Sequence, residues 1–296
     1  MNKSILLIGC NGQVGTQIKQ VLQSCGDLIA VARPEVELTE PETIKHLINQ
    51  NQPQIIINAA AYTAVDKAES EPELANKINA VAPKILAEEA NKSKALLIHI
   101  STDYVFDGKS NCPYRENDST NPISVYGETK LAAEKAIESI CSNYLILRTA
   151  WVYGIGGKSN FVKTMLRLGA QKSELKVVSD QIGSPTWAKD IAQTIAMLVT
   201  EDQPNSGIYH YTNSGVASWY DFAVAIFEEA KFLGFPLKIE RVIPIPTSEY
   251  PTPANRPSYS VLNCAKISSL FESYPPHWRE SLRKMLQEFR KISNQD

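Results

Sequence analysis

Short apolar runs rich in β-branched residues alternate with longer amphipathic stretches through the first half of the chain. Several of the short runs, such as Ile55-Ile56-Ile57, are apolar on both faces, as strands buried inside a parallel sheet must be. The stretches between them have helical periodicity, so the pattern predicts an α/β fold with a doubly wound parallel sheet. The predicted strands are Ser4 to Ile8, Leu28 to Ala32, Gln54 to Asn58, Ala95 to Ser101 and Tyr144 to Thr149.

The pattern loosens after about Gly154, where prolines and serines become frequent. Prolines are dense from Pro236 to Pro257, which excludes a regular helix there and is typical of a loop that covers a ligand. We therefore predict a nucleotide-binding core over residues 1–154 and a smaller, mainly substrate-binding region over residues 155–296, some segments of which return to the core. Helices are predicted in this second half at Phe161 to Gly169, Trp187 to Val199, Trp219 to Phe232 and Trp278 to Ile292.

Composition and charge limit the classes of partner. The 296 residues are 43% hydrophobic and 21% charged, which is typical of a globular protein with one large domain or one domain and an appendage. The net charge of -2 leaves no basic surplus for nucleic acid or an acidic membrane surface, and no apolar run approaches the roughly 18 residues of a membrane span. We expect a small-molecule ligand, with neither nucleic acid nor membrane as a partner.

The cysteines and histidines form no recognisable ligand set. The five cysteines are odd in number and contain no C-x-x-C, and the four histidines are scattered, so neither disulfides nor a transition-metal site is expected. The first eight residues lead into a glycine-rich turn and not into a cleavage site, so no secretory signal is predicted. Reduced thiols and no signal together predict a cytoplasmic protein. The cysteines are Cys10, Cys25, Cys112, Cys141 and Cys264.

A glycine-rich turn joins the first predicted strand to an amphipathic helix that is predicted to end near Ser24. Gly9, Gly12 and Gly15 give the spacing G-x-x-G-x-x-G, which allows a tight turn and a close approach of the backbone to a pyrophosphate at a helix N-terminus. An ordinary strand-to-helix turn can have the same glycine spacing. The N-terminal position of this turn, in a pattern of alternating strands and helices, favours a Rossmann-like dinucleotide site. Its predicted residues are Gly9, Asn11, Gly12, Gln13, Val14 and Gly15.

The second predicted strand is followed by Arg33, where a Rossmann-like unit meets the adenosine ribose. An acidic residue there binds the ribose 2'-hydroxyl of NAD, whereas an arginine can pair with the 2'-phosphate of NADP. The arginine therefore predicts NADPH, with NADH as the second choice; a solvated arginine at a strand end is the alternative interpretation. Glu37 and Leu38 are predicted to lie near the adenine.

Two further strand ends carry residues suited to ligand binding. Small side chains follow the third strand in Asn58 to Thr63, where a ligand can approach the backbone and Thr63 can add a hydroxyl contact, although tight helix packing explains the same pattern. Ser101-Thr102-Asp103 closes the fourth strand. A hydroxyl and a carboxyl at that edge can hydrogen-bond a substrate carbonyl and a neighbouring substrate hydroxyl.

Tyr126 and Lys130 form an i,i+4 pair on a predicted helix. This spacing places both side chains on one face, about 6 Å apart along the axis, so the ammonium can hold a cofactor ribose and lower the pKa of the phenol. Tyr126 can then donate a proton to a carbonyl oxygen as hydride arrives, with Thr102 as a second hydrogen-bond donor. Such a pair alone is usually a surface feature, but together with the three strand ends it predicts a carbonyl reductase.

Seven segments together resemble the extended short-chain dehydrogenases/reductases, and within them the dTDP-4-dehydrorhamnose reductases. The resemblance spans most of the chain and is far more specific than the dinucleotide turn alone. The segments are Gly9 to Gly15, Asn58 to Ser70, Ser101 to Gly108, Tyr126 to Lys130, Arg148 to Gly154, Asp180 to Thr186 and Arg256 to Leu262.

The resemblance implies a reductase that uses NADPH, or NADH, on the 4-keto group of a dTDP-linked 6-deoxyhexulose to give dTDP-L-rhamnose. It implies a catalytic group of Thr102, Tyr126 and Lys130, the last two also contacting the cofactor. Gly12, Gln13 and Val14 are implied to hold the pyrophosphate, and Ala60, Ala61 and Thr63 to line the cofactor. The implied substrate contacts are Val65, Thr102, Asp103 and Trp151, where the indole suits a deoxysugar methyl, although a core aromatic looks the same.

One departure from the family concerns a metal. Some relatives are dimers bridged by Mg²⁺ through carboxylates, and the matching positions here are Gln17 and Lys189. An amide and a cation are poor ligands for a hard ion, so we predict no bridging metal and a monomer or a metal-independent homodimer.

Other interpretations remain open from the sequence alone. A nucleotide-sugar epimerase or dehydratase shares the turn and the Tyr-Lys pair, although Tyr104 after Asp103 disfavours the dehydratases, and a non-catalytic NADP-binding regulatory subunit would also fit. Cys10 and His99 are interpreted as buried core residues, and Asn79 as a helix-surface or core hydrogen-bonding residue or one that reaches the ligand edge.

Overall fold

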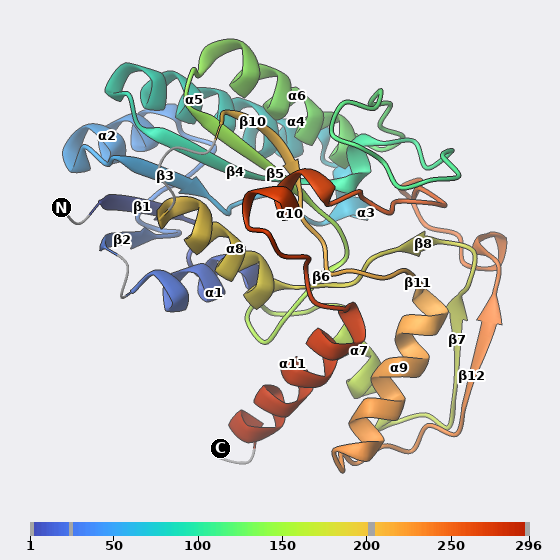
Figure 1. Ribbon diagram of the computed structural model, residues 1–296. Helices are drawn as coiled ribbons and strands as arrows, with labels where there is room; N and C mark the ends of the chain where they lie inside the picture. The colour runs from blue at the N-terminus through green and yellow to red at the C-terminus, as the bar shows by residue number, and fades with distance from the viewer. Residues whose placement is uncertain (1–2, 24–25, 201–204, 294–296) are drawn as a thin grey trace.

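Six parallel strands form the central sheet, in the order β10-β5-β4-β3-β1-β2 (Figure 1). The computed structural model describes residues 3–23, 26–200 and 205–293; Ser24 and Cys25 lie outside the described residues. The five predicted strands are confirmed, two of them to the residue and three with ends shifted by one residue. The strands are β1 (Ser4–Ile8), β2 (Asp27–Val31), β3 (Ile55–Asn58), β4 (Leu96–Thr102), β5 (Tyr144–Thr149) and β10 (Gly207–His210), the last not predicted.

Helices cover both faces of this sheet, which confirms the doubly wound prediction (Figure 1). Ile5 and Leu7 of β1 pack beneath α1 (Gln13–Leu22) and α8 (Ala188–Thr200). The alternate side chains Leu6 and Ile8 belong to the core beneath the helices of the opposite face. This alternation is why the strands are apolar on both sides. The helices of the opposite face are α2 (Pro41–Asn51), α5 (Ala82–Ser93) and α6 (Val125–Ile140).

The strand order reverses at β1, which pairs with β2 on one side and β3 on the other. In open parallel sheets, ligands bind where such a reversal separates the loops at the carboxyl ends of neighbouring strands. Gly9 follows β1 and Ala60 follows β3, so the two predicted cofactor segments lie at this point. The connection after β3 is helical: α3 (Val65–Ala68), α4 (Pro72–Asn76) and a π-helical turn, η1 (Lys77–Val81), lead into α5.

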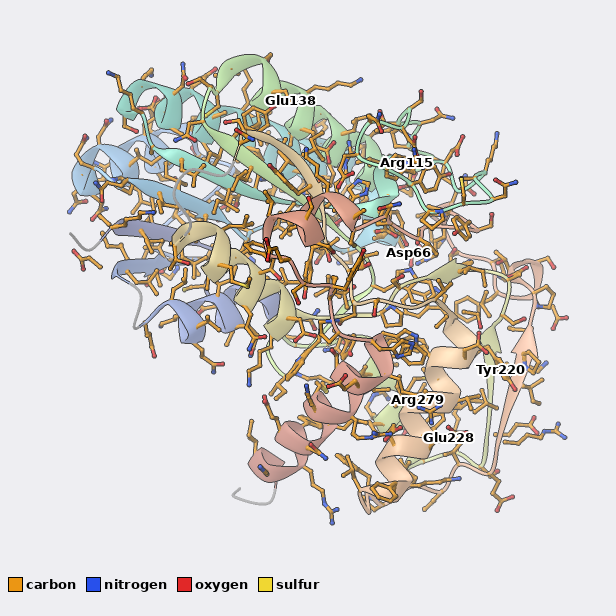
Figure 2. The ribbon with its side chains drawn as sticks, viewed as in Figure 1. Asp66, Arg115, Glu138, Tyr220, Glu228 and Arg279 are labelled. Atoms are coloured by element: carbon orange, nitrogen blue, oxygen red, sulfur yellow. The ribbon has the colours of Figure 1, made fainter. Side chains whose placement is uncertain are left out.

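A second group of elements lies below the sheet in Figure 1 and has its own apolar core. Phe222 and Leu282 are fully buried there. Figure 2 shows Arg279 of α11 and Glu228 of α9 facing each other, and their ion pair measures 2.5 Å. The main elements are α7 (Phe161–Gly169), β7 (Glu174–Val178), α9 (Trp219–Phe232), β12 (Arg241–Ile245) and α11 (Trp278–Ser293).

The remaining elements are short. In the proline-dense segment the structure has β12 and a 3-10 turn, η3 (Thr247–Glu249), and no α-helix, as predicted. α10 (Ala265–Leu270) returns to the sheet, where Ile267 joins the core under α8. The structure also has η2 (Asp103–Val105), β6 (Val152–Tyr153), β8 (Ile182–Gly183), β9 (Thr186–Trp187) and β11 (Ala217–Ser218). Among the described helices, none has the length and apolar character needed to cross a membrane.

Candidate active site

The glycine turn after β1 packs directly against the end of β3. Gly9 has a φ of +87°, and a Cβ there would lie 2.8 Å from the backbone nitrogen of Ala60. A Cβ on Gly15 would lie 2.0 Å from the Gly9 carbonyl oxygen. Both positions therefore need glycine for steric reasons, and the close packing brings the turn and the Ala60 segment into one site.

The first turn of α1 is suited to an anion. Gly12 is the N-cap residue and provides no side-chain cap, so the first N–H groups of the helix have no side-chain acceptor there. The Gln13 side chain turns away to donate to the Val152 carbonyl oxygen (2.8 Å) and accept from Asn160 (2.6 Å). Val14 packs partly into the core, while Asn11 is exposed. The helix end thus fits the pyrophosphate predicted for this turn.

The segment after β3 is fixed by two buried asparagines. Asn58 Oδ1 accepts from the backbone N–H of Ala60 (3.1 Å). Asn79 Oδ1 accepts from the N–H of Tyr62 (2.8 Å), and its Nδ2 donates to the Tyr62 carbonyl oxygen (3.0 Å). Asn79 is therefore a core hydrogen-bonding residue that shapes the segment holding Ala60, Ala61 and the exposed Thr63, and Val65 follows half-buried at the start of α3.

The residues predicted near the adenosine lie at the end of β2. Arg33 is exposed, directly after the strand and its flanking Ala32. Glu37 is held by Thr39, whose backbone N–H and hydroxyl both donate to its carboxylate (3.3 and 3.2 Å). Leu38 packs against the core beneath α2 and α5. An exposed guanidinium at this edge has room to meet a phosphate.

Tyr126 lies in the first turn of α6 beside the end of β4. The helix begins after Ser124, whose hydroxyl accepts from the Gly127 N–H (3.2 Å). The Thr102 hydroxyl lies near enough to the Tyr126 phenol to oppose the rise in its pKa, and the Tyr104 ring meets the Tyr126 ring edge-on at 5.5 Å. The structure thus brings together the predicted proton donor and the predicted second hydrogen-bond donor.

The close approach of α6 to the 103–105 turn depends on Gly127. A Cβ at this position would lie 2.3 Å from the Tyr104 carbonyl oxygen, a backbone atom that cannot move freely. We therefore expect Gly127→Ala to destabilise the fold by about 1–3 kcal/mol. It should also lower kcat by about ten-fold, because the displaced helix carries Tyr126 away from Thr102. Thermal unfolding and steady-state kinetics measure both effects.

The matched control for that substitution is Glu128→Ala, an exposed position in the same helical turn. It should leave the melting temperature and kcat close to those of the unchanged protein. A Gly127→Ala variant with the same stability and kcat as this control would show that the contact at Tyr104 does not set the helix position.

The pKa values of the Tyr-Lys pair differ from the sequence prediction. We expected Lys130 to lower the pKa of Tyr126, but desolvation raises it to about 12 in the ligand-free chain. Burial also lowers the pKa of Lys130 to about 8. The amine also contacts other groups than the phenol: Lys130 Nζ donates to the Ile100 carbonyl oxygen (2.6 Å) and lies 3.1 Å from His99 Nε2.

Asp103 is buried beside the predicted catalytic group and has one free oxygen. Its Oδ1 accepts from the Thr102 hydroxyl (3.1 Å), whereas Oδ2 has no hydrogen-bond partner. Burial raises the pKa of its carboxyl to about 6, against the opposing effect of hydrogen bonds from Ser260 and Thr102. A buried carboxyl oxygen without a partner fits the predicted contact with a substrate hydroxyl.

Trp151 lies where the core meets the lower group of elements. It has a φ of +48° and stacks on Trp219 of α9, with ring centroids 3.5 Å apart and planes 3° from parallel. A Cβ on Gly183 would lie 2.5 Å from the Trp151 ring, so this glycine makes room for the indole. Trp151 is thus partly a core aromatic, which packs against the apolar core that contains α9.

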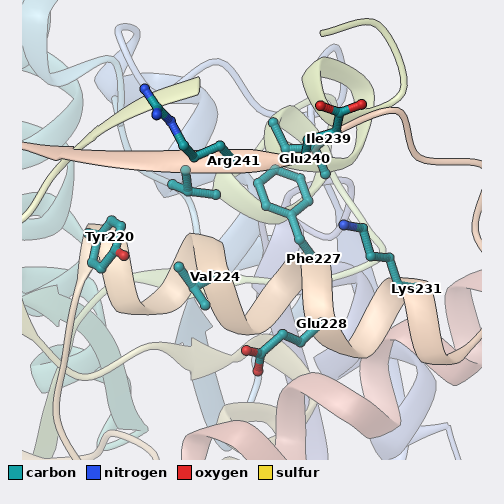
Figure 3. Close-up of a pocket in the computed structure, with 9 residues that line it drawn as sticks. Tyr220, Val224, Phe227, Glu228, Lys231, Ile239, Glu240 and Arg241 are labelled. Carbon is teal, nitrogen blue, oxygen red and sulfur yellow. The ribbon is translucent and has the colours of Figure 1, made fainter. Parts of the chain in front are cut away.

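Two features of the structure lie outside this group. A surface hollow of about 240 Å³ lies between α9 and β12, and Figure 3 shows it lined by Tyr220, Phe227 and Lys231 among others. It contains none of the predicted site residues. Lys189, at the family's metal position, pairs with Glu288 of α11 (2.5 Å), and Gln17 is buried. The described ranges contain no group of three or more His, Cys, Asp or Glu that could hold a metal ion.

The sequence did not predict that His99 and Glu134 act on Lys130. His99 contacts its amine, and Glu134, one turn further along α6, acts on it electrostatically. Glu134 is itself paired with Arg148 of β5 (2.7 Å) inside the protein. The i,i+4 spacing from Lys130 to Glu134 is the sequence signal that could have identified this group.

Comparison with known proteins shows what the chain is similar to. A family model described as the RmlD substrate binding domain matches residues 2–291. A dTDP-4-dehydrorhamnose reductase of Escherichia coli K12 is 45% identical over 292 residues, which are 96% of this chain and 97% of that protein.

Two solved structures extend this likeness to the fold. The crystal structure of a dTDP-4-dehydrorhamnose reductase from Bacillus anthracis in complex with NADP has a TM-score of 0.91 and 36% identity, covering 97% of this chain and 100% of that one. A dTDP-4-dehydrorhamnose reductase from Clostridium acetobutylicum has a TM-score of 0.89 and 41% identity, covering 97% and 99%.

Proposed function

The chain belongs to the family of the RmlD substrate binding domain, and on this premise we propose how its own residues carry out the reaction of its relatives. It is an NADP-dependent oxidoreductase that reduces the 4-keto group of dTDP-4-dehydro-L-rhamnose to give dTDP-L-rhamnose. The observation that carries the assignment of residues is the position of Tyr126 beside Thr102 at the carboxyl end of β4, with Lys130 one turn further along α6.

The proposed cofactor-binding residues follow the carboxyl ends of β1, β2 and β3. The first turn of α1, at Gln13 and Val14, would hold the pyrophosphate, and the small side chains Ala60 and Ala61 leave room beside it. Arg33 would meet the 2'-phosphate of the adenosine ribose, which favours NADPH over NADH. NADPH, when bound, supplies the hydride that the keto carbon receives.

Tyr126 is the proposed general acid. At neutral pH its pKa of about 12 keeps the phenol protonated, so the proton that the substrate oxygen needs is present. Thr102 lies beside the phenol, and its hydroxyl, on turning from Asp103, can donate to the substrate oxygen and share its developing charge. Below its pKa of about 8, Lys130 is charged and favours loss of the Tyr126 proton as the substrate oxygen takes it up. Asp103 Oδ2, Val65 and Trp151 are the proposed contacts to the sugar.

The test is the absorbance of reduced nicotinamide when the purified protein and NADPH receive dTDP-4-keto-6-deoxyglucose together with a 3,5-epimerase. We expect NADPH to be consumed in proportion to the keto sugar, and only when both proteins are present. Tight NADPH binding without turnover would contradict the reductase and favour a non-catalytic binding subunit. Interconversion of sugars without net NADPH consumption would favour an epimerase.

Arg33 gives a prediction about cofactor choice. Arg33→Ala should raise KM for NADPH by roughly ten- to a hundred-fold, the usual effect of losing a hydrogen bond between charged groups, and leave KM for NADH nearly unchanged. Steady-state kinetics with each cofactor measure the ratio. Glu35→Ala, a neighbouring exposed position, is the matched control and should not change it. An unchanged NADPH preference in Arg33→Ala would remove Arg33 from the cofactor site.

We also propose which half of the chain binds the cofactor and which binds the substrate, the oligomeric state of the protein, and its cellular location. The proposed core is residues 1–154, and residues 155–296 form mainly the substrate region, supported by the separate apolar core under α9 and α11. A monomer or a metal-independent homodimer is supported by the Lys189–Glu288 pair. A cytoplasmic location is supported by free thiols at Cys10, Cys112, Cys141 and Cys264, as in a reducing compartment.

A further inference from the structure

A line of three buried side chains runs from β3 through β4 to α6. Asn58 Nδ2 lies 3.1 Å from His99 Nδ1, and His99 Nε2 lies 3.1 Å from Lys130 Nζ. All three residues are about 1% exposed. Because no water can complete their hydrogen bonds, each contact needs one donor and one acceptor from within the line.

The backbone fixes the direction of this line at its first member. Asn58 Oδ1 accepts from the Ala60 N–H (3.1 Å), so the amide must turn its Nδ2 donor toward His99. His99 Nδ1 is then the acceptor, and a neutral imidazole carries its proton on Nε2. That proton points at Lys130 Nζ.

Only an uncharged lysine amine can accept this proton. An ammonium has three donors and no lone pair, so a charged Lys130 would force either the His99–Lys130 contact or the Asn58–His99 contact to be lost. The neutral amine satisfies both, because it accepts from His99 Nε2 and donates to the Ile100 carbonyl oxygen (2.6 Å). We propose that His99, oriented by Asn58, is a positioning residue that favours the uncharged form of Lys130 in the ligand-free protein, so that the amine loses its proton at a lower pH than it would without His99.

The other groups around Lys130 agree with this assignment. Tyr126 lies one turn before it on α6, and Glu134 one turn after it raises its pKa but is paired with Arg148. Burial holds the pKa of His99 well below its ordinary value, and a charged Lys130 would lower it further, so the ring is neutral in either state of the lysine. The proposal rests on the proposed function only where it concerns turnover, because the tautomer of His99 is a property of the free protein.

The first test is the tautomer itself, read from long-range ¹H–¹⁵N spectra of ligand-free protein labelled with ¹⁵N-histidine, at a pH above the Lys130 pKa of about 8, where the amine is uncharged. We expect His99 to carry its proton on Nε2. His210 is an internal control, because its Nδ1 donates to the Tyr114 carbonyl oxygen (3.1 Å) and its Nε2 faces the Arg148 guanidinium (3.4 Å), so it should carry the proton on Nδ1. A His99 ring protonated on Nδ1 would overturn the proposal, whether or not the protein turns over the sugar.

The second test is the pH dependence of kcat/KM, which reports ionisations of the free enzyme. With a pKa of about 8 for Lys130, activity should fall as pH rises through about 8, because the charged lysine is lost. His99→Leu removes the donor that favours the uncharged amine, so the fall should move to higher pH by roughly one unit.

Should this variant not fold, Asn58→Asp supplies the alternative. The introduced carboxylate would accept from His99 Nδ1–H, which leaves His99 Nε2 as an acceptor for the Lys130 ammonium. The fall in kcat/KM should therefore move to higher pH in this variant as well. A folded variant of either kind with an unmoved profile would overturn the proposal.

Discussion

Tyr126→Phe is expected to lower kcat by about a hundred- to ten-thousand-fold, the usual contribution of a positioned general acid. The substitution removes one oxygen atom and keeps the ring, which packs edge-on against Tyr104. Cofactor binding should therefore persist, and the loss should appear in kcat and kcat/KM together, because the proton is transferred only in the transition state. NADPH oxidation under saturating substrate measures the rate, and protein fluorescence titrated with NADPH measures the binding.

The control for this prediction removes the same atom from a tyrosine far from the site. Tyr209 on β10 donates its hydroxyl to the Asn205 carbonyl oxygen (2.8 Å), so Tyr209→Phe loses a structural hydrogen bond of comparable size. It should keep a kcat close to that of the unchanged protein. If Tyr126→Phe retained turnover within about ten-fold of this control, another group would have to donate the proton.

The sheet was predictable from the sequence because its strands are buried on both faces. Ile55-Ile56-Ile57 and Leu96-Leu97-Ile98 are apolar at consecutive positions, and such runs have few other places in a globular fold. β10 was not predicted, since Gly207 to His210 is short and begins with glycine. It is a strand because its backbone pairs with β5, where Ile208 lies opposite Ile146. That pairing is a long-range property that no local pattern contains.

The site was predictable as a set of residues at strand ends, but the side chains that contact Lys130 were not. Tyr126 and Lys130 were found by their spacing, whereas the partners of Lys130 depend on the register between α6 and β4. His99 and Ser101 point to the same face of β4, and they meet Lys130 and Glu134, which are four residues apart on the helix. A period of two on a strand thus matches a period of four on the helix above it. His99 was interpreted as a satisfied core histidine, and it is one, but its partner is Lys130, the proposed catalytic lysine.

The buried ion pair behind Lys130 gives the largest expected effect on stability. Glu134 and Arg148 are 1% and 2% exposed, and the Arg148 guanidinium donates Nε and Nη2 to the Glu134 carboxylate (3.0 and 2.7 Å). The guanidinium also lies over the Phe106 ring, 5.1 Å from its centroid. Taking two charges out of water costs about as much as their attraction returns, so the pair matters chiefly because neither member is tolerated alone.

Glu134→Gln should therefore lower the free energy of unfolding by about 3–5 kcal/mol, because it leaves the Arg148 charge buried without a counter-charge. Urea titration of the ligand-free protein measures the loss. The double variant Glu134→Leu/Arg148→Met removes both charges and should recover most of that stability, less the hydrogen bond that Glu134 accepts from Ser101. A single variant destabilised by less than about 1 kcal/mol would mean that the guanidinium finds another partner.

The same substitution should be visible in catalysis. Glu134 raises the pKa of Lys130 through its charge, so Glu134→Gln lowers that pKa, and the alkaline fall in kcat/KM should move to lower pH. His99→Leu moves it the other way, so the two variants bracket the unchanged protein. Opposite shifts would show that Lys130 controls the alkaline side of the profile, with His99 and Glu134 acting on it from opposite sides. Shifts of one sign, or none, would assign that ionisation to another group.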